Sequence, residues 1–446
     1  MTSPTLPVPT AEGLGTDSPL RTDRMAAGLG VALGVCFTVC FATGMLSHLI
    51  QDPPSWFLWP TRPVGLYRVT QGLHVATGLG LIPILLAKLW VVYPKLFRFP
   101  PATSVGDAVS RLGDALLVGG GLFLVFSGTA NLARWRPWGF GFTAGHYWTA
   151  LLAYGALLVH VAHKAATTRQ ELRGPLRALA ARFLPGRAPD DGVGAAGADA
   201  PEAADEAAGA GADGDAAAAT GEDSPAPTAT DEDAPVPTDA RGPHALTRRG
   251  FLGAVALASA AITVTTVGQT APWFRRLNLL GPRRSDVGPQ GVPVNTPAAG
   301  AGVEEAVTSD AALADYRLTV TGAVDRELEL TLDDLRAMPQ HSEDLPIACV
   351  EGWSADARWT GVRVRDLLER AGARDGAEVT VVSLQDPSLY ASSELNRLQA
   401  ADDKTLLALR LHDEPLHADH GRPVRLIGAN RPGVQQTKWV TRLEVR

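Results

Sequence analysis

The sequence predicts a multidomain protein in which an all-α transmembrane bundle precedes a mixed α+β domain. Four apolar stretches lie before residue 170 and a fifth at 251–273, each near the roughly 20 residues that cross a bilayer. From residue 316 onward the long apolar stretches give way to short segments in which apolar and polar residues alternate, which is typical of mixed strands and helices. At 446 residues, the chain is long enough for several domains.

The five predicted spans are followed or separated by loops of different composition. Lys and Arg gather before the first span, between the second and third, and after the fourth, whereas the loops after spans one and three are rich in tryptophan. Basic loops favour the cytoplasm, so we expect the N-terminus inside and residues from about 275 outside the membrane. The spans are about Met25–Leu49, Leu66–Val92, Leu112–Leu132, His146–Ala166 and Phe251–Trp273.

Charge is concentrated in one segment between spans four and five. Residues 189–240 hold 14 Asp and Glu and no Lys or Arg, so this segment accounts for the formal charge of -7 and the rest of the chain is net basic. This charge distribution does not imply nucleic-acid binding. This Ala, Gly and Pro-rich segment cannot bury enough apolar surface to order itself, so we expect a disordered linker. The expected division of the chain is 1–24 (cytoplasmic tail), 25–170 (four-helix bundle), 171–246 (cytoplasmic linker), 247–274 (fifth span), 275–310 (external linker) and 311–446 (external domain).

Five of the ten histidines lie in or beside the first four spans, where ionisable residues usually mark function. His146 and His160 are about 21 Å apart along one helix, and His74 and His146 share the outer depth. This arrangement resembles the four-helix cytochrome b subunits of respiratory formate dehydrogenases and hydrogenases. The resemblance implies that His74 and His146 bind the iron of one b-type haem. His48 is a competing ligand. The alternatives are two haems, with the second at the level of His160, or interfacial histidines without haem.

The segment that precedes the fifth span resembles a twin-arginine translocation signal, which directs folded proteins across a membrane. Its residues are Thr247-Arg248-Arg249-Gly250-Phe251-Leu252. A domain that acquires a bulky cofactor in the cytoplasm has a reason to cross already folded. The alternative is a basic flank that only orients the helix.

The C-terminal domain contains one cysteine, and a cysteine thiolate is a suitable soft ligand for a metal. With three cysteines in the chain, two of them in the first span, no disulfide framework is available. We expect strands at 316–322, 378–384, 423–427 and 438–445, and short helices at 330–338 and 362–370. Thr331 and Asp334 are placed to cap the first of these helices.

Ordered motifs in this domain resemble the sulfite oxidase and methionine sulfoxide reductase catalytic-subunit family. They are Cys349-Val350-Glu351-Gly352-Trp353-Ser354, Arg358-Trp359-Thr360-Gly361-Val362, Asp366-Leu367-Leu368, Asp413-Glu414-Pro415-Leu416, His420–Leu426 and Gly433–Trp439. The resemblance implies a mixed α+β sulfite oxidase-type molybdopterin domain. It implies Cys349 as the molybdenum ligand, whereas an inert core cysteine is the alternative.

The same resemblance implies the other residues of the site. The cofactor-binding candidates are His420, Arg425, Gly433, Val434, Gln435 and Lys438, and the catalytic candidates beside Cys349 are Arg358 and Tyr390. Ala348 stands where sulfite oxidases commonly carry an arginine, which weakens the case for sulfite as the substrate.

These observations predict a molybdopterin-dependent oxidoreductase in the bacterial cytoplasmic membrane. It would transfer an oxygen atom outside the membrane, with a small-molecule or protein-sulfoxide substrate, and exchange electrons with quinone through haem b. One alternative keeps the molybdenum site and uses the bundle only as an anchor or docking element. The other is a non-enzymatic electron carrier with a degenerate outer domain.

Overall fold

The computed structural model describes residues 18–97, 102–135, 138, 141–183, 247–267, 272–281, 283, 287–386 and 390–446. Residues up to 173 and from 247 onward belong to one unit by their contacts, and 174–246 belong to another. The predicted acidic linker at 189–240 and residues 1–17 of the predicted tail lie outside the described residues.

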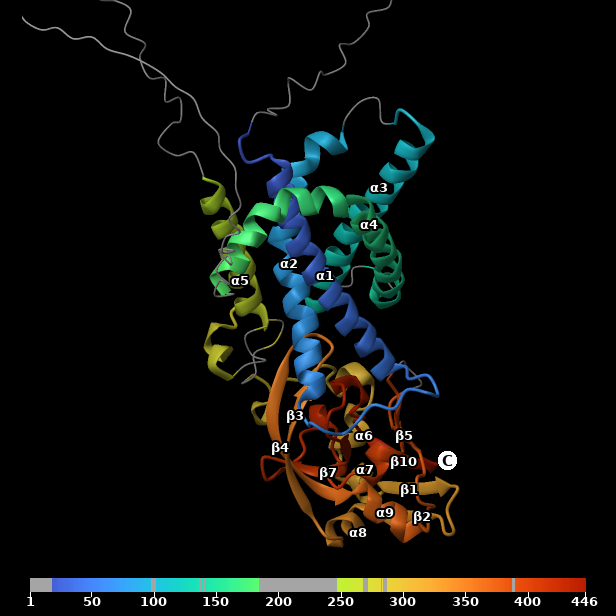
Figure 1. Ribbon diagram of the computed structural model, residues 1–446. Helices are drawn as coiled ribbons and strands as arrows, with labels where there is room; N and C mark the ends of the chain where they lie inside the picture. Colours follow the sequence, from blue (N-terminus) through green and yellow to red (C-terminus); the bar gives the residue numbers. More distant parts are fainter. Residues whose placement is uncertain are drawn as a thin grey trace, which may run out of the picture. The chain divides into compact units, whose positions relative to one another are not determined.

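Five helices in the described part of the chain are long and apolar enough to cross a membrane (Figure 1). Four predicted spans fall inside α1 to α4, and the fifth begins in α5 but extends past the end of that helix at Val267. The Thr22 and Ser104 side chains cap α1 and α3 by accepting backbone N–H groups of the first turn. The bounds are α1 Asp23–Gln51, α2 Leu66–Leu96, α3 Val105–Leu132, α4 Thr143–Phe183 and α5 Arg248–Val267.

The α2 helix packs against both α1 and α5. Thr263 of α5 donates to the carbonyl of Ala76 in α2 at 3.3 Å. The α1 and α4 helices meet through aromatic stacking of Phe41 on Tyr154, with ring centroids 4.0 Å apart. These contacts between helices, rather than backbone propensity alone, hold the bundle together.

Two sheets form the C-terminal domain (Figure 1). The first has the order β2-β1-β10-β5-β6, with β1 parallel to β10, and the second has the order β3-β4-β7-β8, with β9 also paired to β7. The strands are β1 Arg317–Gly322, β2 Leu328–Thr331, β3 His341–Ala348, β4 Ser354–Arg363, β5 Val379–Ser383, β6 Ser392–Leu395, β7 Leu406–Leu411, β8 Glu414–Pro415, β9 Arg425–Ile427 and β10 Val440–Val445.

Short helices cover the sheets. The predicted capping arrangement is confirmed in α8, where Thr331 and Asp334 cap each other's backbone N–H. The α9 helix buries Leu367 and Leu368 in the domain core and ends at Gly372, whose φ of 75° is the left-handed conformation. The helices are α6 Glu304–Thr308, α7 Asp310–Ala314, α8 Leu332–Ala337, α9 Val364–Ala371 and α10 Arg397–Ala401, with 3-10 turns η3 Pro272–Leu277, η4 Pro289–Gly291, η5 Ala299–Ala301, η6 Ala418–His420 and η7 Gly433–Gln435.

Residues 287–310, which the sequence predicts as part of a linker, pack on the domain. Val292 is 1% exposed and joins the cluster around Trp359. Val303 and Val307 are buried against Trp439. The folded domain therefore extends N-terminal of residue 311, because this segment supplies apolar side chains that the domain core encloses.

Candidate active site

A tight turn between β3 and β4 holds Cys349. Its N–H donates to the carbonyl of Trp353 at 2.9 Å, and the Gly352 N–H donates back to the Cys349 carbonyl at 3.0 Å. Gly352 closes the turn with a φ of 84°, which glycine adopts without steric cost. Burial, and then the charge of Glu351, raise the pKa of the Cys349 thiol to about 12. The thiol is therefore neutral at pH 7 until a metal ion displaces its proton.

The loop that includes η7 lies directly against this turn. Pro432 forms a parallel bridge with Ala348. A Cβ atom at Gly433 would lie 3.2 Å from the Ala348 carbonyl oxygen and 3.4 Å from the Cα of Cys349. The absence of a side chain at Gly433 lets the two segments approach closely beside the cysteine.

Two cationic side chains are buried near the cysteine. Arg425 donates to the His420 carbonyl at 3.2 Å and stacks over Trp359, and burial lowers its pKa to about 10. Lys438 donates to the carbonyl of Asp419 at 3.0 Å. Burial, and then the nearby Arg425 charge, lower the pKa of Lys438 well below its usual value.

Among the residues that the structure describes, neither Arg425 nor Lys438 forms a salt bridge. The Nε atom of Arg425 is also buried without a hydrogen-bond partner. A buried charge without a counterion is costly. The two side chains therefore suit an anionic ligand such as a phosphate, which accepts charge-assisted hydrogen bonds.

His420 lies beside these two side chains and is neutral at pH 7. Its Nε2 donates to the Pro289 carbonyl at 2.8 Å, since a carbonyl oxygen can only accept. Burial, and then the Arg425 charge, lower the pKa of His420 to about 4. The imidazole thus adds a fixed hydrogen bond rather than a third charge at neutral pH.

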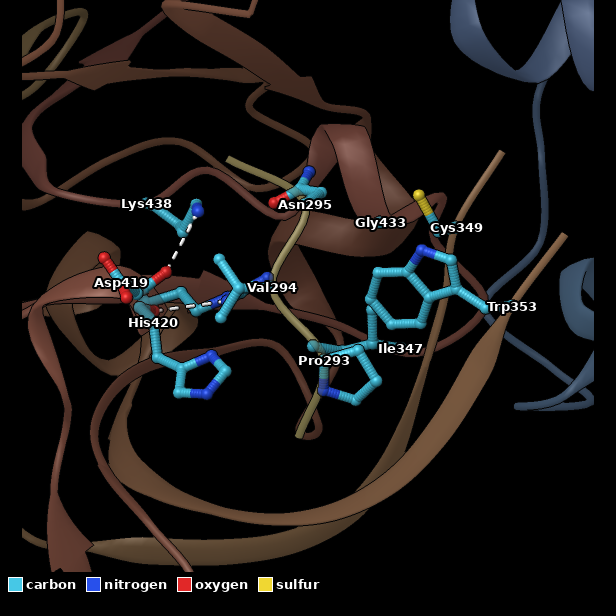
Figure 2. Close-up of a pocket in the computed structure, with 11 residues that line it drawn as sticks. Pro293, Val294, Asn295, Ile347, Cys349, Trp353, Asp419, His420, Gly433 and Lys438 are labelled. Atoms are coloured by element: carbon cyan, nitrogen blue, oxygen red, sulfur yellow. Dashed lines mark hydrogen bonds between the residues drawn. The ribbon is translucent and has the colours of Figure 1, made fainter. Parts of the chain in front are cut away.

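A narrow cavity, with room for about one water molecule, lies among these groups. In Figure 2, Cys349 and Trp353 lie on one side, Lys438 and His420 lie on the other, and the segment at 293–295 passes between them. A second, wider cavity of about 400 Å³ shares Asn295, Gly433 and Lys438 with the first. We call the two adjoining cavities the recess: the Cys349 thiol lies at one end, and Arg425 and Lys438 lie farther along, beside the Asp419 carboxylate.

The structure brings seven of the nine predicted residues of this domain to the recess. Two others lie elsewhere. The side chain of Gln435 donates to the carbonyls of Ile50 and Gln51 at the end of α1. Arg358 is exposed on β4, because side chains alternate along a strand and its neighbour Trp359 points into the core. Lining the recess are Cys349, Tyr390, His420, Arg425, Gly433, Val434 and Lys438.

Sequence reasoning missed residues that shape the recess. Asn295 lines both cavities but comes from the segment predicted as a linker. Arg431 is 2% exposed and donates to the carbonyls of Glu394 and Gln435, both at 2.9 Å, which fixes the η7 loop from behind. No periodicity marks either position. Only the neighbouring Pro432-Gly433 pair signals an unusual loop.

In the helical bundle, His74 and His146 are neighbours, with ring centroids 6.4 Å apart. The Nδ1 of His74 donates to the Cys40 carbonyl at 2.8 Å. The Nδ1 of His146 lies 2.9 Å from the Ser127 hydroxyl, whose own proton is donated to a backbone carbonyl. Both rings therefore carry their proton on Nδ1 and keep the Nε2 lone pair for a ligand.

The other histidines of the bundle have different neighbours. His160 pairs with Asp114 at 2.8 Å, and His48 packs on Tyr147 with ring centroids 4.1 Å apart. Glycines leave room for the rings of His74 and His146, since a Cβ at Gly44 would lie 2.8 Å from the His74 ring. Gly128 similarly adjoins His146.

Comparison with known proteins assigns the fold of the C-terminal part to a family. Residues 304–446 match the oxidoreductase molybdopterin binding domain. The chain is 31% identical over 156 residues to the mitochondrial sulfite oxidase of Drosophila melanogaster, covering 29% of this chain and 27% of that protein. It is 33% identical over 132 residues to a putative protein-methionine-sulfoxide reductase subunit, YedZ1, of Azospira oryzae, covering 30% of this chain and 49% of that protein.

Among solved structures, the chain is similar to the sulfane dehydrogenase SoxCD from Paracoccus pantotrophus. The identity is 25%, the TM-score is 0.28, and the match covers 30% of this chain and 38% of that one. The chain thus spans about a quarter to a half of the lengths of the relatives described above. The matched region contains the cysteine turn, both buried cations and the η7 loop.

Proposed function

We propose that the protein is a membrane-bound molybdopterin-dependent oxidoreductase of the sulfite oxidase and methionine sulfoxide reductase type. One observation carries the proposal: a buried thiol and two buried cations without salt bridges among the described residues line one recess of a molybdopterin-binding domain. When bound, the molybdenum cofactor supplies oxygen-atom transfer.

The residues of the recess divide the work of holding such a cofactor. Cys349 would bind the metal as a thiolate, since its backbone is fixed by the Trp353 and Gly352 bonds. Arg425 and Lys438 would bind the phosphate of the pterin. The close contact of Gly433 with the cysteine turn would keep the η7 loop against it, and Cys349 itself is buried.

We infer that the substrate is a sulfoxide, either a small molecule or a protein side chain. The similarity to the putative protein-methionine-sulfoxide reductase subunit of Azospira oryzae supports this class, and Ala348 supplies no guanidinium for sulfite beside the cysteine. Tyr390, 47% exposed, lines the wider part of the recess. A substrate that arrives from solvent would meet Tyr390 before the thiol.

Purified full-length protein tests this function. We expect molybdenum to copurify and methionine sulfoxide to be reduced with reduced viologen as the electron donor. Cys349→Ser should abolish turnover and the molybdenum signal while the fold survives, because a hydroxyl is a harder and poorly ionised ligand. Equal turnover in the variant would exclude Cys349 as the ligand, and oxidation of sulfite without sulfoxide reduction would exclude the substrate class.

We further propose that His74 and His146 bind one b-type haem in the bundle. Two imidazoles that bind one metal ion at about 2 Å each have ring centroids roughly 6 Å apart, close to the observed 6.4 Å. Both Nε2 atoms are available for the iron, and Ser127 and the Cys40 carbonyl hold the rings. The pair lies near the beginnings of α2 and α4.

Haem absorbance of the purified protein tests this pair. His74→Ala or His146→Ala should remove the absorbance, whereas His160→Ala should leave most of it, because His160 pairs with Asp114 instead. Loss of all haem in His160→Ala together with normal haem in His146→Ala would exclude the assignment. Molybdenum without any haem would favour the bundle as an anchor only.

The location follows from the same proposal: the helices cross the bacterial cytoplasmic membrane and the C-terminal domain lies outside it. The domain touches the bundle where α1 and α3 end and α2 begins, through the Gln435, Glu351 and Asn430 bonds. This is the end that the basic-residue pattern assigns to the outer face. A quinol dissolved in the membrane would supply electrons to the haem, and the twin-arginine motif before α5 would direct export of the folded domain.

A further inference from the structure

The cysteine turn rests directly on the bundle, at the end where α1 and α3 finish and α2 begins, which we call the outer end. The Gln71 side chain donates to the Val350 carbonyl at 3.0 Å. A Cβ at Gly352 would lie 3.0 Å from Val75 and 3.3 Å from Leu132. The residue that follows the proposed metal ligand is thus hydrogen-bonded to α2.

Gln71 is held at both ends of its amide. Its oxygen accepts the Ser47 hydroxyl of α1 at 3.0 Å while its nitrogen donates to the domain. Gln71 is only 6% exposed, so water does not compete for either hydrogen bond. His74 follows three residues later on the same helix, about 4.5 Å farther along the axis.

We propose that the Val350 carbonyl and the Gln71 amide form the electron-transfer bridge between the Cys349 centre and the His74–His146 pair. The inference rests on the proposed function. A hydrogen bond attenuates electron tunnelling less than a van der Waals gap of the same span, and this bond joins the two sites by a continuous path: Cys349, Val350, Gln71 and the α2 backbone to His74.

The electron count is balanced by the proposed reaction. One sulfoxide, two electrons and two protons give one sulfide and one water, so the sulfur is reduced and its oxygen leaves as water. Oxidation of one quinol to quinone releases two electrons and two protons. The electrons would pass along the Gln71 bridge one at a time, because a haem iron carries a single electron.

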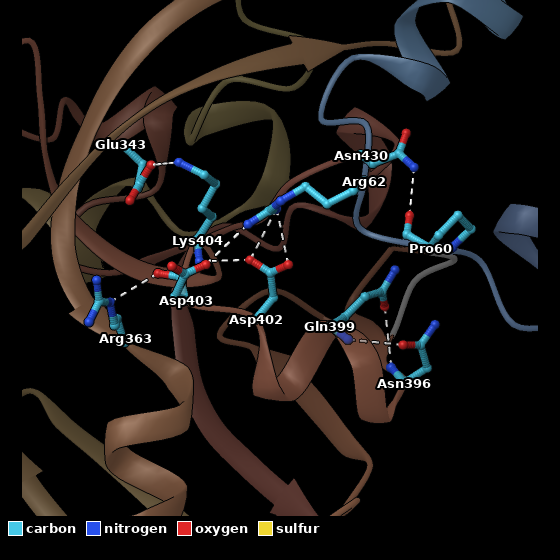
Figure 3. Close-up of polar contacts among 10 residues, drawn as sticks. All are labelled: Pro60, Arg62, Glu343, Arg363, Asn396, Gln399, Asp402, Asp403, Lys404 and Asn430. Carbon is cyan, nitrogen blue, oxygen red and sulfur yellow. Dashed lines mark hydrogen bonds and ion pairs between the residues drawn. The ribbon is translucent and has the colours of Figure 1, made fainter.

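Many other contacts hold the domain on the bundle, so a single change at Gln71 should not release it. Figure 3 shows Asn430 donating to the Pro60 carbonyl and Arg62 paired with Asp402 and Asp403. Asn430 also accepts the Tyr67 N–H at 2.6 Å. The bridge can therefore be tested without separating the two parts.

The test uses full-length protein in detergent, with Gln71→Met, which keeps the side-chain length but cannot donate to Val350. The haem is reduced by a quinol, and methionine sulfoxide is then mixed in while haem reoxidation is followed by absorbance. We expect a several-fold slower reoxidation in the variant. Sulfoxide reduction driven by reduced viologen, which can reach the domain from solvent, should keep the wild-type rate.

Arg62→Gln is the control at the outer end, because it weakens contacts between bundle and domain, with Asp402 and Asp403, that lie off this path. It should reoxidise at the wild-type rate. Equal rates in all three proteins overturn the bridge and leave the proposed function intact. A wild-type haem that sulfoxide does not reoxidise, despite viologen-driven turnover, overturns the haem route and the bridge together.

Discussion

At the scale of single residues, the protonation states of the side chains in the recess depend on their burial. His420 is the residue in which this effect is easiest to measure. It is 1% exposed, donates to Pro289 and lies near the Arg425 charge. Protonation would add a further positive charge beside the buried Arg425 guanidinium and Lys438.

We expect the cofactor-free protein to lose stability as the pH falls from about 6.5 toward 4. The folded-state pKa of His420 is about 4, below the ordinary 6.5, so the unfolded chain binds the proton more tightly in this window. The stabilisation is present above pH 6.5 and is lost as the pH falls through the folded value. The loss at pH 5 is about 2 kcal/mol from this residue.

Denaturant unfolding followed by tryptophan fluorescence at pH 7 and pH 5 measures this loss. His420→Gln is the control, because glutamine can still donate to the Pro289 carbonyl but does not titrate in this range. The variant should show a smaller difference between the two pH values. An unchanged pH dependence in His420→Gln would assign the acid sensitivity to other groups.

At the scale of elements, two loops with left-handed glycines offer a direct comparison. Gly421 has a φ of 104°, and a Cβ there would lie 3.0 Å from the Cβ of Lys438 and 3.1 Å from that of Arg425. Gly376 has a φ of 81° with nothing within 4 Å of the same position. An alanine at either glycine strains the backbone, but only the first also pushes on the recess.

We therefore expect Gly376→Ala to cost about 1 kcal/mol of unfolding free energy, from backbone strain alone. Gly421→Ala should cost more, and it should also lower the molybdenum content, because Lys438 and Arg425 must move apart. Thermal unfolding of the two variants measures the stability cost, and metal analysis measures their molybdenum content. Equal molybdenum content in both proteins would show that the cation pair tolerates the displacement.

The elements differ in how well the sequence predicts them. The α1 to α4 helices follow from long apolar stretches, and α9 follows from its amphipathic pattern before Gly372. The packing of the segment at 287–310 could not be predicted from the sequence, because its buried valines are isolated between short turns and show neither helical nor strand periodicity. The cysteine turn was found through its motif, although the pattern does not reveal that Gly352 touches α2.

At the scale of the whole molecule, the contacts between bundle and domain were beyond sequence reasoning. The Gln71 bond to Val350 and the Trp59 bond to Asn430 end on backbone carbonyls, which any residue carries. Partners of this kind leave no signature in residue type. Asp356 is the clearest side-chain case, since Arg68 of α2 and Arg275 of η3 both pair with it.

Export is also a property of the whole molecule, since the four helices before the linker and the domain after it would have to reach their places by different routes. The proposed twin-arginine motif, at Arg248 and Arg249, stands at the start of α5. Lysine at both positions preserves the charge that orients a helix in the membrane. It does not preserve the guanidinium groups that the export machinery reads.

We expect Arg248→Lys combined with Arg249→Lys to keep the domain in the cytoplasm, because a folded, cofactor-loaded domain has no other route across. Protease added outside spheroplasts should then spare the domain in the double variant and degrade it in the wild type. Arg169→Lys with Arg173→Lys makes the same exchange on α4 and should leave the domain accessible, since those positions contribute only charge. Cleavage of the domain in the Arg248→Lys, Arg249→Lys protein to the wild-type extent would mean that charge alone orients α5 and that the motif does not direct export.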